Sequence, residues 1–349
     1  MKRVLIGVSV IILSLSFHAY SQSITLPEGS FRDITKNDFA DKNLPSSLFN
    51  ELWTYHVRFD NGVQAIYTFS INDFGSFKER VTGVKLIVSW KDGKTYVVNK
   101  EYDPRDFINE PDSNYIRPNA DRPYWAKGDF EDEHRLFFHN TKDGVQYDLD
   151  ITFSNIAKGK VLGNGKYKVG DHEVGMSLLI PHANVEGMIA INKDTLQVSG
   201  VGYMDHIYQN NLSTKMINES YRIKTGDAQN GMFLHFMTLS GSRGKHPVGY
   251  GIGYRNGMEY MLTPSAIEQV SSGNINSHLD DRIMIKPYQA DSLHIRVTEH
   301  LNTYSLLSEL GGIKKFFAKR FLGGQLFEMN GTVMINDEQP GFYYYLSTE

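Results

Sequence analysis

The sequence of 349 residues contains no cysteine. This absence excludes disulfide bonds, a cysteine nucleophile, thiolate metal sites and a lipid anchor on an N-terminal cysteine. Histidine is present, but in neither His-x-His nor His-Glu-x-x-His spacing, so the sequence predicts no metal site. A Gly-x-Ser-x-Gly motif is also missing. Gly251-Ile-Gly253 precedes no predicted helix, so we expect no bound dinucleotide and no other cofactor.

An excess of basic residues is lacking as well. The chain has 36 Lys and Arg against 40 Asp and Glu, for a formal net charge of −4. Nucleic-acid binding requires a basic surface, so we expect no nucleic-acid partner. Beyond the N-terminus no apolar run reaches the length of about 18 residues that a membrane helix needs, so we expect no integral membrane span.

The N-terminus has the pattern of a secretory signal. Met1-Lys2-Arg3 is charged, residues 4–17 are apolar, and Ala19-Tyr20-Ser21 supplies a small-x-small cleavage pattern. We therefore expect residues 1–21 to be a cleaved signal peptide and the mature chain to be exported to the periplasm or secreted. An exported chain without cysteine fits a bacterial periplasm.

Alternation of apolar and polar residues indicates β-structure along most of the chain. Residues 53–59 alternate, reach a turn at Asp60-Asn61-Gly62, and alternate again over 63–71. Asn-Gly between two alternating segments is the strongest short signal of a hairpin. Similar turns occur at Asp92-Gly93, Asp143-Gly144 and Asn192-Lys193-Asp194. Consecutive hairpins of this kind are typical of an up-and-down antiparallel barrel.

The length of the chain exceeds what one such barrel holds, so we expect two domains. A polar segment at residues 207–215 is the best boundary, and it divides the mature chain into residues 22–212 and 213–349. Two segments break the β-pattern. We expect residues 102–124 to form a long loop and residues 306–321 to form a helix.

The segment Gly202-Tyr203-Met204-Asp205-His206 carries the strongest chemical signal. It follows a strand-like run, so Tyr203 and Asp205 are expected on one face of a strand and His206 on the other. A carboxylic acid beside a phenol in an apolar interior can deliver a proton. The alternative is that Asp205 and His206 only tie down the end of a strand by hydrogen bonds.

Three segments together resemble the tandem lipocalin-like proteins of the AttH and hydroxyneurosporene synthase (carotenoid 1,2-hydratase) family. They are Glu51-Leu52-Trp53-Thr54-Tyr55 before the first hairpin, Pro181-His-Ala-Asn-Val185-Glu-Gly187, and Gly200-Val-Gly202-Tyr203-Met-Asp205-His206. The resemblance implies an all-β fold of two consecutive lipocalin-like (calycin) antiparallel β-barrels over the whole mature chain. The family includes hydratases of isoprenoid double bonds and cyclases.

The sequence departs from the family in two places. Ile207-Tyr208 follows the motif where many relatives have an aromatic residue and glycine, and Leu52 occupies a position where a second tryptophan is common. The substrate of a relative is therefore not transferred to this chain.

Protonation of an alkene requires a strong acid and a wall that stabilises a carbocation. Asp205 with a raised pKa is the candidate acid, Tyr203 its hydrogen-bonding or cation-facing partner, and His206 the third catalytic candidate. Trp53 and Tyr55 are candidate walls of a substrate site through cation–π attraction. Their alternative role is plain barrel core.

His182 and Glu186 flank Val185 and are candidates for positioning water or substrate, although His182 also fits a structural role.

Two functions stay open. One is an exported, cofactor-independent enzyme that hydrates or cyclises a hydrophobic isoprenoid or polyketide-like molecule. The other is a non-catalytic periplasmic carrier of a lipid or another apolar ligand. The surroundings of Asp205 discriminate between them, because an acid that lines a cavity favours catalysis.

Overall fold

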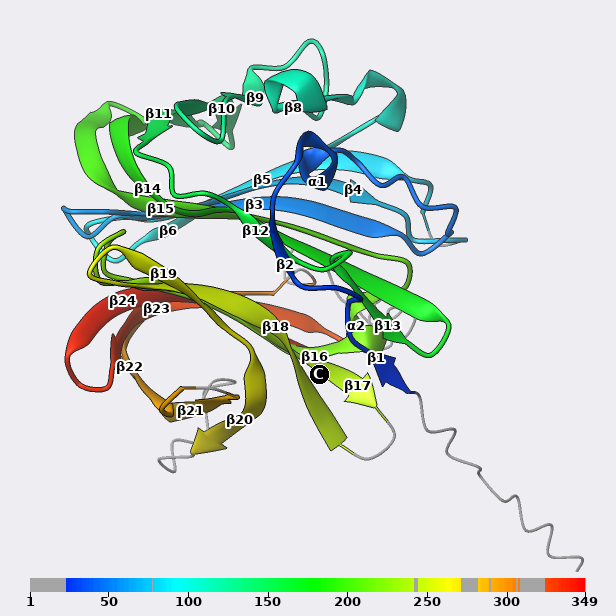
Figure 1. Cartoon of the computed structure of the whole chain (residues 1–349). Coiled ribbons are helices and arrows are strands. Elements are labelled where there is room, and N and C mark those ends of the chain that lie inside the picture. Colours follow the sequence, from blue (N-terminus) through cyan, green and yellow to red (C-terminus); the bar gives the residue numbers. More distant parts are fainter. Residues whose placement is uncertain are drawn as a thin grey trace, which may run out of the picture.

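The computed structural model describes residues 23–76, 78–241, 244–270, 282–288, 290–305, 307 and 324–348, and these are almost entirely antiparallel β-strands (Figure 1). The predicted signal peptide and nearly all of the predicted helix at 306–321 lie outside the described residues. Among the described residues, no helix combines the length and the apolar character needed to cross a membrane.

The N-terminal sheet is a half-barrel. Its main strands follow the order β6-β5-β4-β3-β15-β14-β11-β10-β9-β8-β7, and four short strands pair beside this path. The strands are β1 (Ile24–Thr25), β2 (Phe31–Asp33), β3 (Asn50–Phe59), β4 (Gln64–Asn72), β5 (Val81–Ser89), β6 (Thr95–Tyr102), β7 (Ile108–Glu110), β8 (Tyr115–Arg117), β9 (Tyr124–Gly128), β10 (His134–Lys142), β11 (Val145–Ser154), β12 (Lys160–Leu162), β13 (Lys166–Val169), β14 (His172–Ile191) and β15 (Asp194–Gln209).

The C-terminal sheet is a nearly closed barrel with the order β19-β18-β17-β16-β24-β23-β22-β21-β20, and β18 contacts β20 where the two ends meet. Its strands are β16 (Ile217–Thr225), β17 (Met232–Gly241), β18 (Gly244–Arg255), β19 (Met258–Leu262), β20 (Pro264–Val270), β21 (Arg282–Pro287), β22 (Leu293–Ser305), β23 (Leu326–Ile335) and β24 (Gln339–Thr348). The predicted fold class, all-β with two consecutive lipocalin-like barrels, is confirmed, with the first barrel only half closed.

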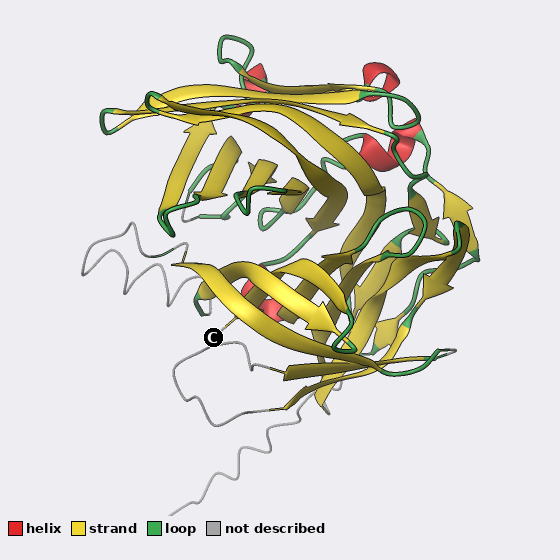
Figure 2. Ribbon diagram, turned by 90° about the vertical axis from the view of Figure 1, so that its left-hand side faces the viewer, coloured by secondary structure: helices red, strands yellow, loops and turns green. Residues whose placement is uncertain are grey.

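Helical structure is confined to short turns. They are α1 (Lys36–Phe39), α2 (Ser213–Met216) and the 3₁₀ turns η1 (Pro104–Asp106) and η2 (Pro111–Ser113). The two sheets lie against each other, with β16, β17 and β24 of the C-terminal barrel next to β3 and β15 of the half-barrel (Figures 1 and 2). The chain passes from one sheet to the other between Gln209 and Ile217, through α2.

The predicted hairpin turns form as the sequence indicates. Asp143 and Gly144 both have positive φ, 53° and 78°, as a two-residue turn of type I′ requires. The expectation of a long loop at residues 102–124 was wrong, because β7 and β8 add to the edge of the sheet beside β9. Two of the prolines that suggested a loop begin the 3₁₀ turns η1, before β7, and η2, between β7 and β8.

One glycine of the family-like segment has a clear structural reason. Gly187 has φ +148°, and a Cβ atom there would lie 2.1 Å from the carbonyl oxygen of Asp150 on β11. Only glycine allows β14 to approach β11 this closely. Upstream, β14 shifts register between Leu178 and Ala183, which bends the strand from the half-barrel toward the C-terminal sheet.

Buried apolar side chains form three main clusters: the half-barrel interior, the junction between the sheets, and the C-terminal barrel interior. Because β15 separates the first cluster from the second, its alternate side chains enter different surroundings. The 202–206 segment therefore contacts both the half-barrel interior and the junction.

Candidate functional site

The two faces of β15 meet different partners. Tyr203 and Asp205 are directed toward the C-terminal sheet, where Tyr203 belongs to the junction cluster. His206 is directed into the half-barrel, where its ring stacks on Trp53 at 4.5 Å between centroids. All three side chains are buried. The alternation expected for a strand therefore separates His206 from the other two candidate catalytic residues.

Asp205 forms an ion pair across the junction. Its Oδ2 accepts a hydrogen bond of 2.5 Å from Arg222 Nε on β16, and its Oδ1 accepts one of 3.3 Å from Arg222 Nη2. His235 Nδ1 on β17 lies 3.2 Å from Oδ2. Burial alone would raise the pKa of Asp205, but the contacts with Arg222 and His235 lower it to about 2. The expectation of a raised pKa was wrong, because sequence periodicity does not reveal the arginine.

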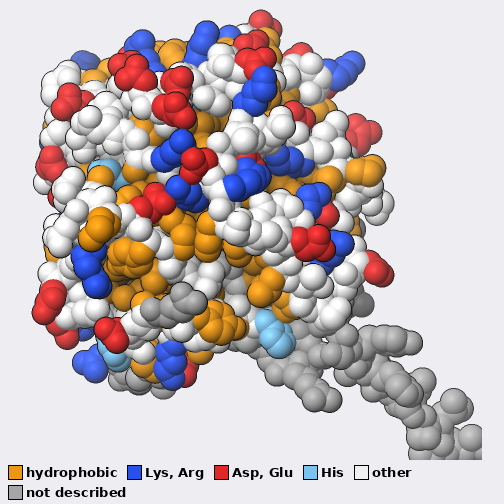
Figure 3. Space-filling view, in the orientation of Figure 1, with side chains coloured by type: hydrophobic (Ala, Val, Ile, Leu, Met, Phe, Trp, Pro, Cys, Tyr) orange, Lys and Arg blue, Asp and Glu red, His pale blue; other side chains and the backbone are white. Residues whose placement is uncertain are grey.

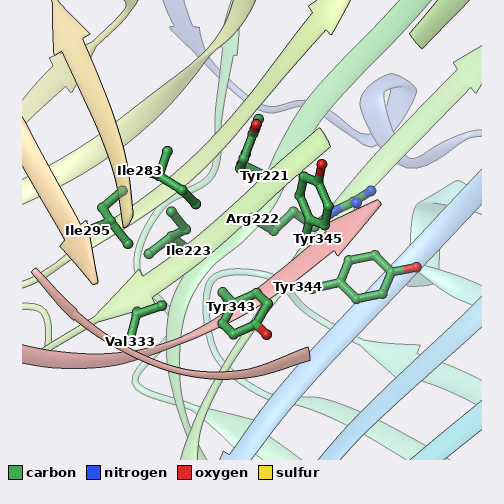
Figure 4. Close-up of a pocket in the computed structure, with 9 residues that line it drawn as sticks. All are labelled: Tyr221, Arg222, Ile223, Ile283, Ile295, Val333, Tyr343, Tyr344 and Tyr345. Carbon is green, nitrogen blue, oxygen red and sulfur yellow. The ribbon is translucent and has the colours of Figure 1, made fainter. Parts of the chain in front are cut away.

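Arg222, the partner of Asp205, lies on β16, a strand with one apolar face and one polar face. On β16, Tyr221 and Ile223 enter the barrel interior, whereas Ser220, Arg222 and Lys224 alternate with them. Figure 4 shows Arg222 and Tyr344 directed away from Ile283 and Ile295, toward the strands of the half-barrel. The guanidinium lies 5.1 Å from the Tyr344 ring centroid, a cation–π contact.

Tyr203 has partners other than Asp205. Its hydroxyl lies 2.9 Å from His56 Nδ1, and its ring stacks on Phe233 at 4.0 Å. Burial lowers the pKa of His56 to about 3, so the ring is neutral at pH 7. His56 Nε2 in turn lies 3.3 Å from Gln64 Oε1, and Gln64 donates to the carbonyl of Gly331 across the junction. Tyr203 and Asp205 thus each take part in buried polar contacts that join the two sheets.

His206 and Trp53 hold the α1 segment against the half-barrel. Trp53 Nε1 donates to the carbonyl of Phe39 at 2.8 Å. His206 places Nδ1 2.6 Å from the carbonyl of Asp38 and Nε2 2.8 Å from Glu51 Oε1. Both ring nitrogens thus lie within hydrogen-bond distance of an oxygen atom. Glu51 also accepts the backbone N–H of Lys42. The segment from Asp38 to Lys42 is therefore fixed by three buried side chains.

Tyr55 belongs to a polar pair inside the half-barrel. Its hydroxyl lies 2.8 Å from Nε2 of His134 on β10, and the two rings stack at 5.7 Å. Both residues are fully buried, and within the described part of the chain His134 Nδ1 has no hydrogen-bond partner. Burial lowers the pKa of His134 to about 3 and raises that of Tyr55 well above its ordinary value. The nearby rings of Phe69 and Phe153 make the surroundings aromatic.

His182 and Glu186 lie apart from the Tyr55–His134 pair. His182 is buried, and burial together with the charge of Lys224 lowers its pKa to about 4. Lys224 Nζ donates to the carbonyls of Thr225 and Gly226, and burial lowers the pKa of Lys224 to about 7. Glu186 is exposed on β14. The structure does not bring Glu186 to a common site with Trp53 and Tyr55.

Two cavities of the C-terminal barrel differ greatly in size. The one in Figure 4, lined by Arg222, Ile223 and Tyr343 among others, measures about 10 Å³, which is room for about one water molecule. The other measures about 220 Å³ and lies at the end of the barrel. Asp205, Tyr203 and His206 line neither cavity. In the described ranges, no group of three or more His, Asp or Glu side chains is arranged to hold a metal ion.

Sequence reasoning missed Arg222, His235, His56 and His134. Arg222 and His235 come from the two strands that follow β15, whereas His56 and His134 are far in sequence from their partners Tyr203 and Tyr55. Local alternation cannot say which of these strands face one another. One signal could have pointed to His56 and Arg222. Each is a polar residue in a strand that is buried on both faces, and such a residue needs a polar partner.

No protein-family model and no curated protein matches this sequence. Solved structures do match the fold. An AttH-like protein from Nitrosomonas europaea superposes with a TM-score of 0.61 at 13% identity, covering 93% of this chain and 98% of that one. CghA, solved with Sch210972, gives a TM-score of 0.58 at 11% identity over 92% and 98% of the two chains.

Kievitone hydratase from Nectria haematococca gives a TM-score of 0.51 at 12% identity and covers 90% of this chain and 92% of that one. The chain therefore has the tandem lipocalin-like fold of these proteins along nearly its whole described length. This is the fold that the three sequence segments predicted.

Proposed function

We propose that this chain is an exported, cofactor-independent enzyme that hydrates or cyclises a hydrophobic small molecule. Two proteins of the same fold support the proposal, since one is a hydratase and the other was solved with a small molecule. Low identity limits these comparisons to the fold, so the chemistry is argued from this chain's own residues.

The observation that carries the proposal is the Tyr55–His134 pair. A buried polar atom without a partner is rare in proteins and calls for an explanation. His134 Nδ1 is such an atom within the described residues, and it lies in an interior lined by aromatic rings. A water molecule or a substrate oxygen bound there would supply the missing partner.

The pair combines a donor with an acceptor. Burial keeps His134 neutral and Tyr55 protonated at pH 7. In the tautomer with its proton on Nε2, His134 donates to the Tyr55 oxygen, so the phenol can donate to a substrate oxygen and Nδ1 can accept a hydrogen bond from water or from substrate. Aromatic walls such as Phe153 favour an apolar substrate and stabilise positive charge that develops on it. The α1 segment, held by Trp53 and His206, covers this interior and excludes bulk water.

Asp205 has a different place in this proposal. Its carboxylate is ionised and paired with Arg222, so in this arrangement it has no proton to deliver. The contacts of Asp205 with Arg222 and His235 support a structural role, in which Asp205 joins the two sheets, and not the role of a catalytic acid.

The test uses protein purified from its native host and an apolar extract of the same cells, incubated in water enriched in ¹⁸O. Mass spectrometry should show a compound that gains one labelled oxygen, for hydration, or one that isomerises without a change of mass, for cyclisation. Tyr55→Phe and His134→Gln should each slow this conversion by about 10²-fold or more. Tyr67→Phe is the matched control, because it removes another buried phenol from the same interior, one that among the described residues donates to the backbone carbonyl of Phe137.

A carrier is the second candidate, and the ion pair of Asp205 together with the cavity of about 220 Å³ favours it. A carrier would retain a compound from the extract unchanged. Equal conversion by Tyr67→Phe, Tyr55→Phe and wild type would reject the proposed role of the pair. Retention without any conversion would reject the enzyme and establish the carrier.

Export is tested separately. The pattern at residues 1–21 predicts that protein recovered from the periplasm or medium begins at Gln22. Recovery of the full-length chain from the cytoplasm would overturn this part of the proposal.

A further inference from the structure

The cavity of about 220 Å³ lies at the mouth of the C-terminal barrel. It is formed where the turns after β16, β18, β21 and β23 converge at one end of the barrel. Its floor is apolar and consists of the buried side chains of Met232, Leu262, Leu293 and Ile335, which belong to the interior cluster of this barrel. Barrel mouths are a common position for small-molecule sites.

Three amide side chains line the rim, and in each of them the amide oxygen accepts a hydrogen bond from the protein. Asn230 and Asn336 each accept a backbone N–H with Oδ1, at 3.1 and 2.9 Å, and Gln339 Oε1 accepts the hydroxyl of Thr225. In each amide the oxygen is therefore occupied. The NH₂ groups remain, and within the described part of the chain they have no acceptor. The rim thus offers donors to an oxygen of a bound molecule.

The charges at the rim disfavour an ionic ligand. Arg255 is the basic residue of the lining, and its guanidinium packs over the Tyr260 ring at 5.8 Å. Asp291 and Glu338 are the acidic residues of the same lining. Charges of both signs around one mouth largely cancel and select neither an anion nor a cation, so the apolar floor makes a neutral ligand the best fit.

Exposed apolar side chains flank the same end of the barrel. Met258 and Tyr288, exposed by 67% and 69%, are two of the large hydrophobic residues most exposed in the described ranges. Met258 begins β19 next to Arg255, and Tyr288 follows β21 just before the cavity-lining turn. Figure 3 shows hydrophobic side chains gathered on the face of the C-terminal sheet, while charged side chains are more frequent above them on the N-terminal half.

We propose that this mouth binds a compact, neutral, apolar molecule that carries an acceptor oxygen, such as a ketone or an ester. The apolar body lies on the Leu262, Leu293 and Ile335 floor, and the oxygen accepts from the amide NH₂ groups. An apolar cavity of about 150 Å³ accommodates benzene, so this larger one accommodates a substituted ring. The site lies on the C-terminal barrel, away from the Tyr55–His134 pair, and it does not depend on the proposed function.

The experiment compares acetophenone with ethylbenzene, which has a similar shape but no carbonyl oxygen. Each is titrated into the full chain, and binding is measured by calorimetry and by the methyl NMR signals of Met232, Leu262, Leu293 and Ile335. We expect saturable shifts of the methyl signals of these four residues with acetophenone, and at least about fivefold weaker binding of ethylbenzene, the equivalent of one lost hydrogen bond.

Asn336→Asp is the diagnostic variant. Aspartate keeps an oxygen for the backbone N–H, tolerates the left-handed φ of 50° at this position, and replaces the NH₂ donor by an acceptor. Asn192→Asp is its matched control, since Asn192 has φ 56° in a turn of the half-barrel and its Oδ1 also accepts a backbone N–H. The first variant should weaken acetophenone by about fivefold or more without weakening ethylbenzene, and the second should change neither.

Leu293→Trp fills the cavity and should abolish binding of both compounds, provided that its circular dichroism matches the wild type. If that variant does not fold, the Asn336→Asp comparison decides alone. The proposal is overturned if acetophenone does not bind, if it shifts signals elsewhere but not those of the floor, or if Asn336→Asp binds it as tightly as Asn192→Asp does.

Discussion

Arg222 Nε lies 2.5 Å from Asp205 Oδ2, and this contact joins a strand of the C-terminal barrel to a strand of the half-barrel. Both side chains are buried. Desolvation makes such a pair costly to bury, so its net contribution to stability is small, but loss of one partner leaves an uncompensated buried charge. The pair therefore specifies how the two sheets pack, and it explains why a carboxylate at this position is ionised.

A second ion pair crosses the same junction and gives a first prediction. Lys85 Nζ on β5 donates to both carboxylate oxygens of Glu328 on β23 at 2.6 Å, and both side chains are largely buried. Glu328→Gln should lower the free energy of unfolding by about 3 kcal/mol in urea denaturation. Glu101→Gln removes the carboxylate of the exposed Lys78–Glu101 pair and should cost less than about 1 kcal/mol. Equal losses in the two variants would show that the junction pair has no special importance.

The contact between Trp53 and the α1 segment predicts a local effect. Trp53→Phe removes the donor to the Phe39 carbonyl, so the amides of residues 38–42 should exchange hydrogen about fivefold faster or more, as expected for one lost hydrogen bond. Trp90→Phe is the control, because Trp90 Nε1 contacts Asp194 in a different part of the half-barrel. Unchanged exchange at residues 38–42 in Trp53→Phe would contradict the anchoring role.

Buried neutral histidines predict a dependence of stability on pH. Burial lowers the pKa of His56 and His134 to about 3 and that of His182 and His235 to about 4, against about 6.5 in the unfolded chain. Below pH 6.5 the unfolded state therefore binds protons that the folded state does not. The free energy of unfolding should fall as the pH is lowered from 6.5 toward 4.

Asp205 adds to this loss at lower pH. Its pKa of about 2 in the folded state is below the unfolded value of about 3.9, so its stabilising contribution is lost as the pH falls from about 4 to 2. Urea denaturation at a series of pH values measures the effect. His134→Gln, which keeps a partner for Tyr55 but does not titrate, should show a shallower fall between pH 6.5 and 4. A free energy of unfolding that stays constant over this range would contradict the neutral buried state of these rings.

The local fold was predictable from the sequence because the signal for each hairpin, a turn sequence between two alternating segments, lies within a few residues. Gly62 in the first turn, and Asp143 and Gly144 in the later one, adopt the positive φ values that their turns need, and strand alternation correctly separates His206 from Asp205. The segment at residues 102–124 was misjudged, because prolines that begin 3₁₀ turns look like those of an irregular loop.

The site was less predictable, because its partners come from other strands. Arg222 is only 17 residues from Asp205 but lies on a strand of the other sheet, and His134 is 79 residues from Tyr55. The way strands pair and the two sheets pack together determines these contacts. The alternation of residues within one strand does not indicate which strands will pack against it. The raised pKa expected for Asp205 failed for this reason, since burial was anticipated but the guanidinium was not.

Asp205→Asn provides the most direct test of the joining role of the 202–206 segment. The substitution keeps the size of the side chain but removes the charge that compensates Arg222 in the junction. We predict that urea denaturation will show a loss of about 3 kcal/mol or more in the free energy of unfolding, and that the additional substitution Arg222→Met will recover most of it. An Asp205→Asn variant as stable as the wild type, with its turnover abolished, would contradict this account and restore Asp205 as the catalytic acid.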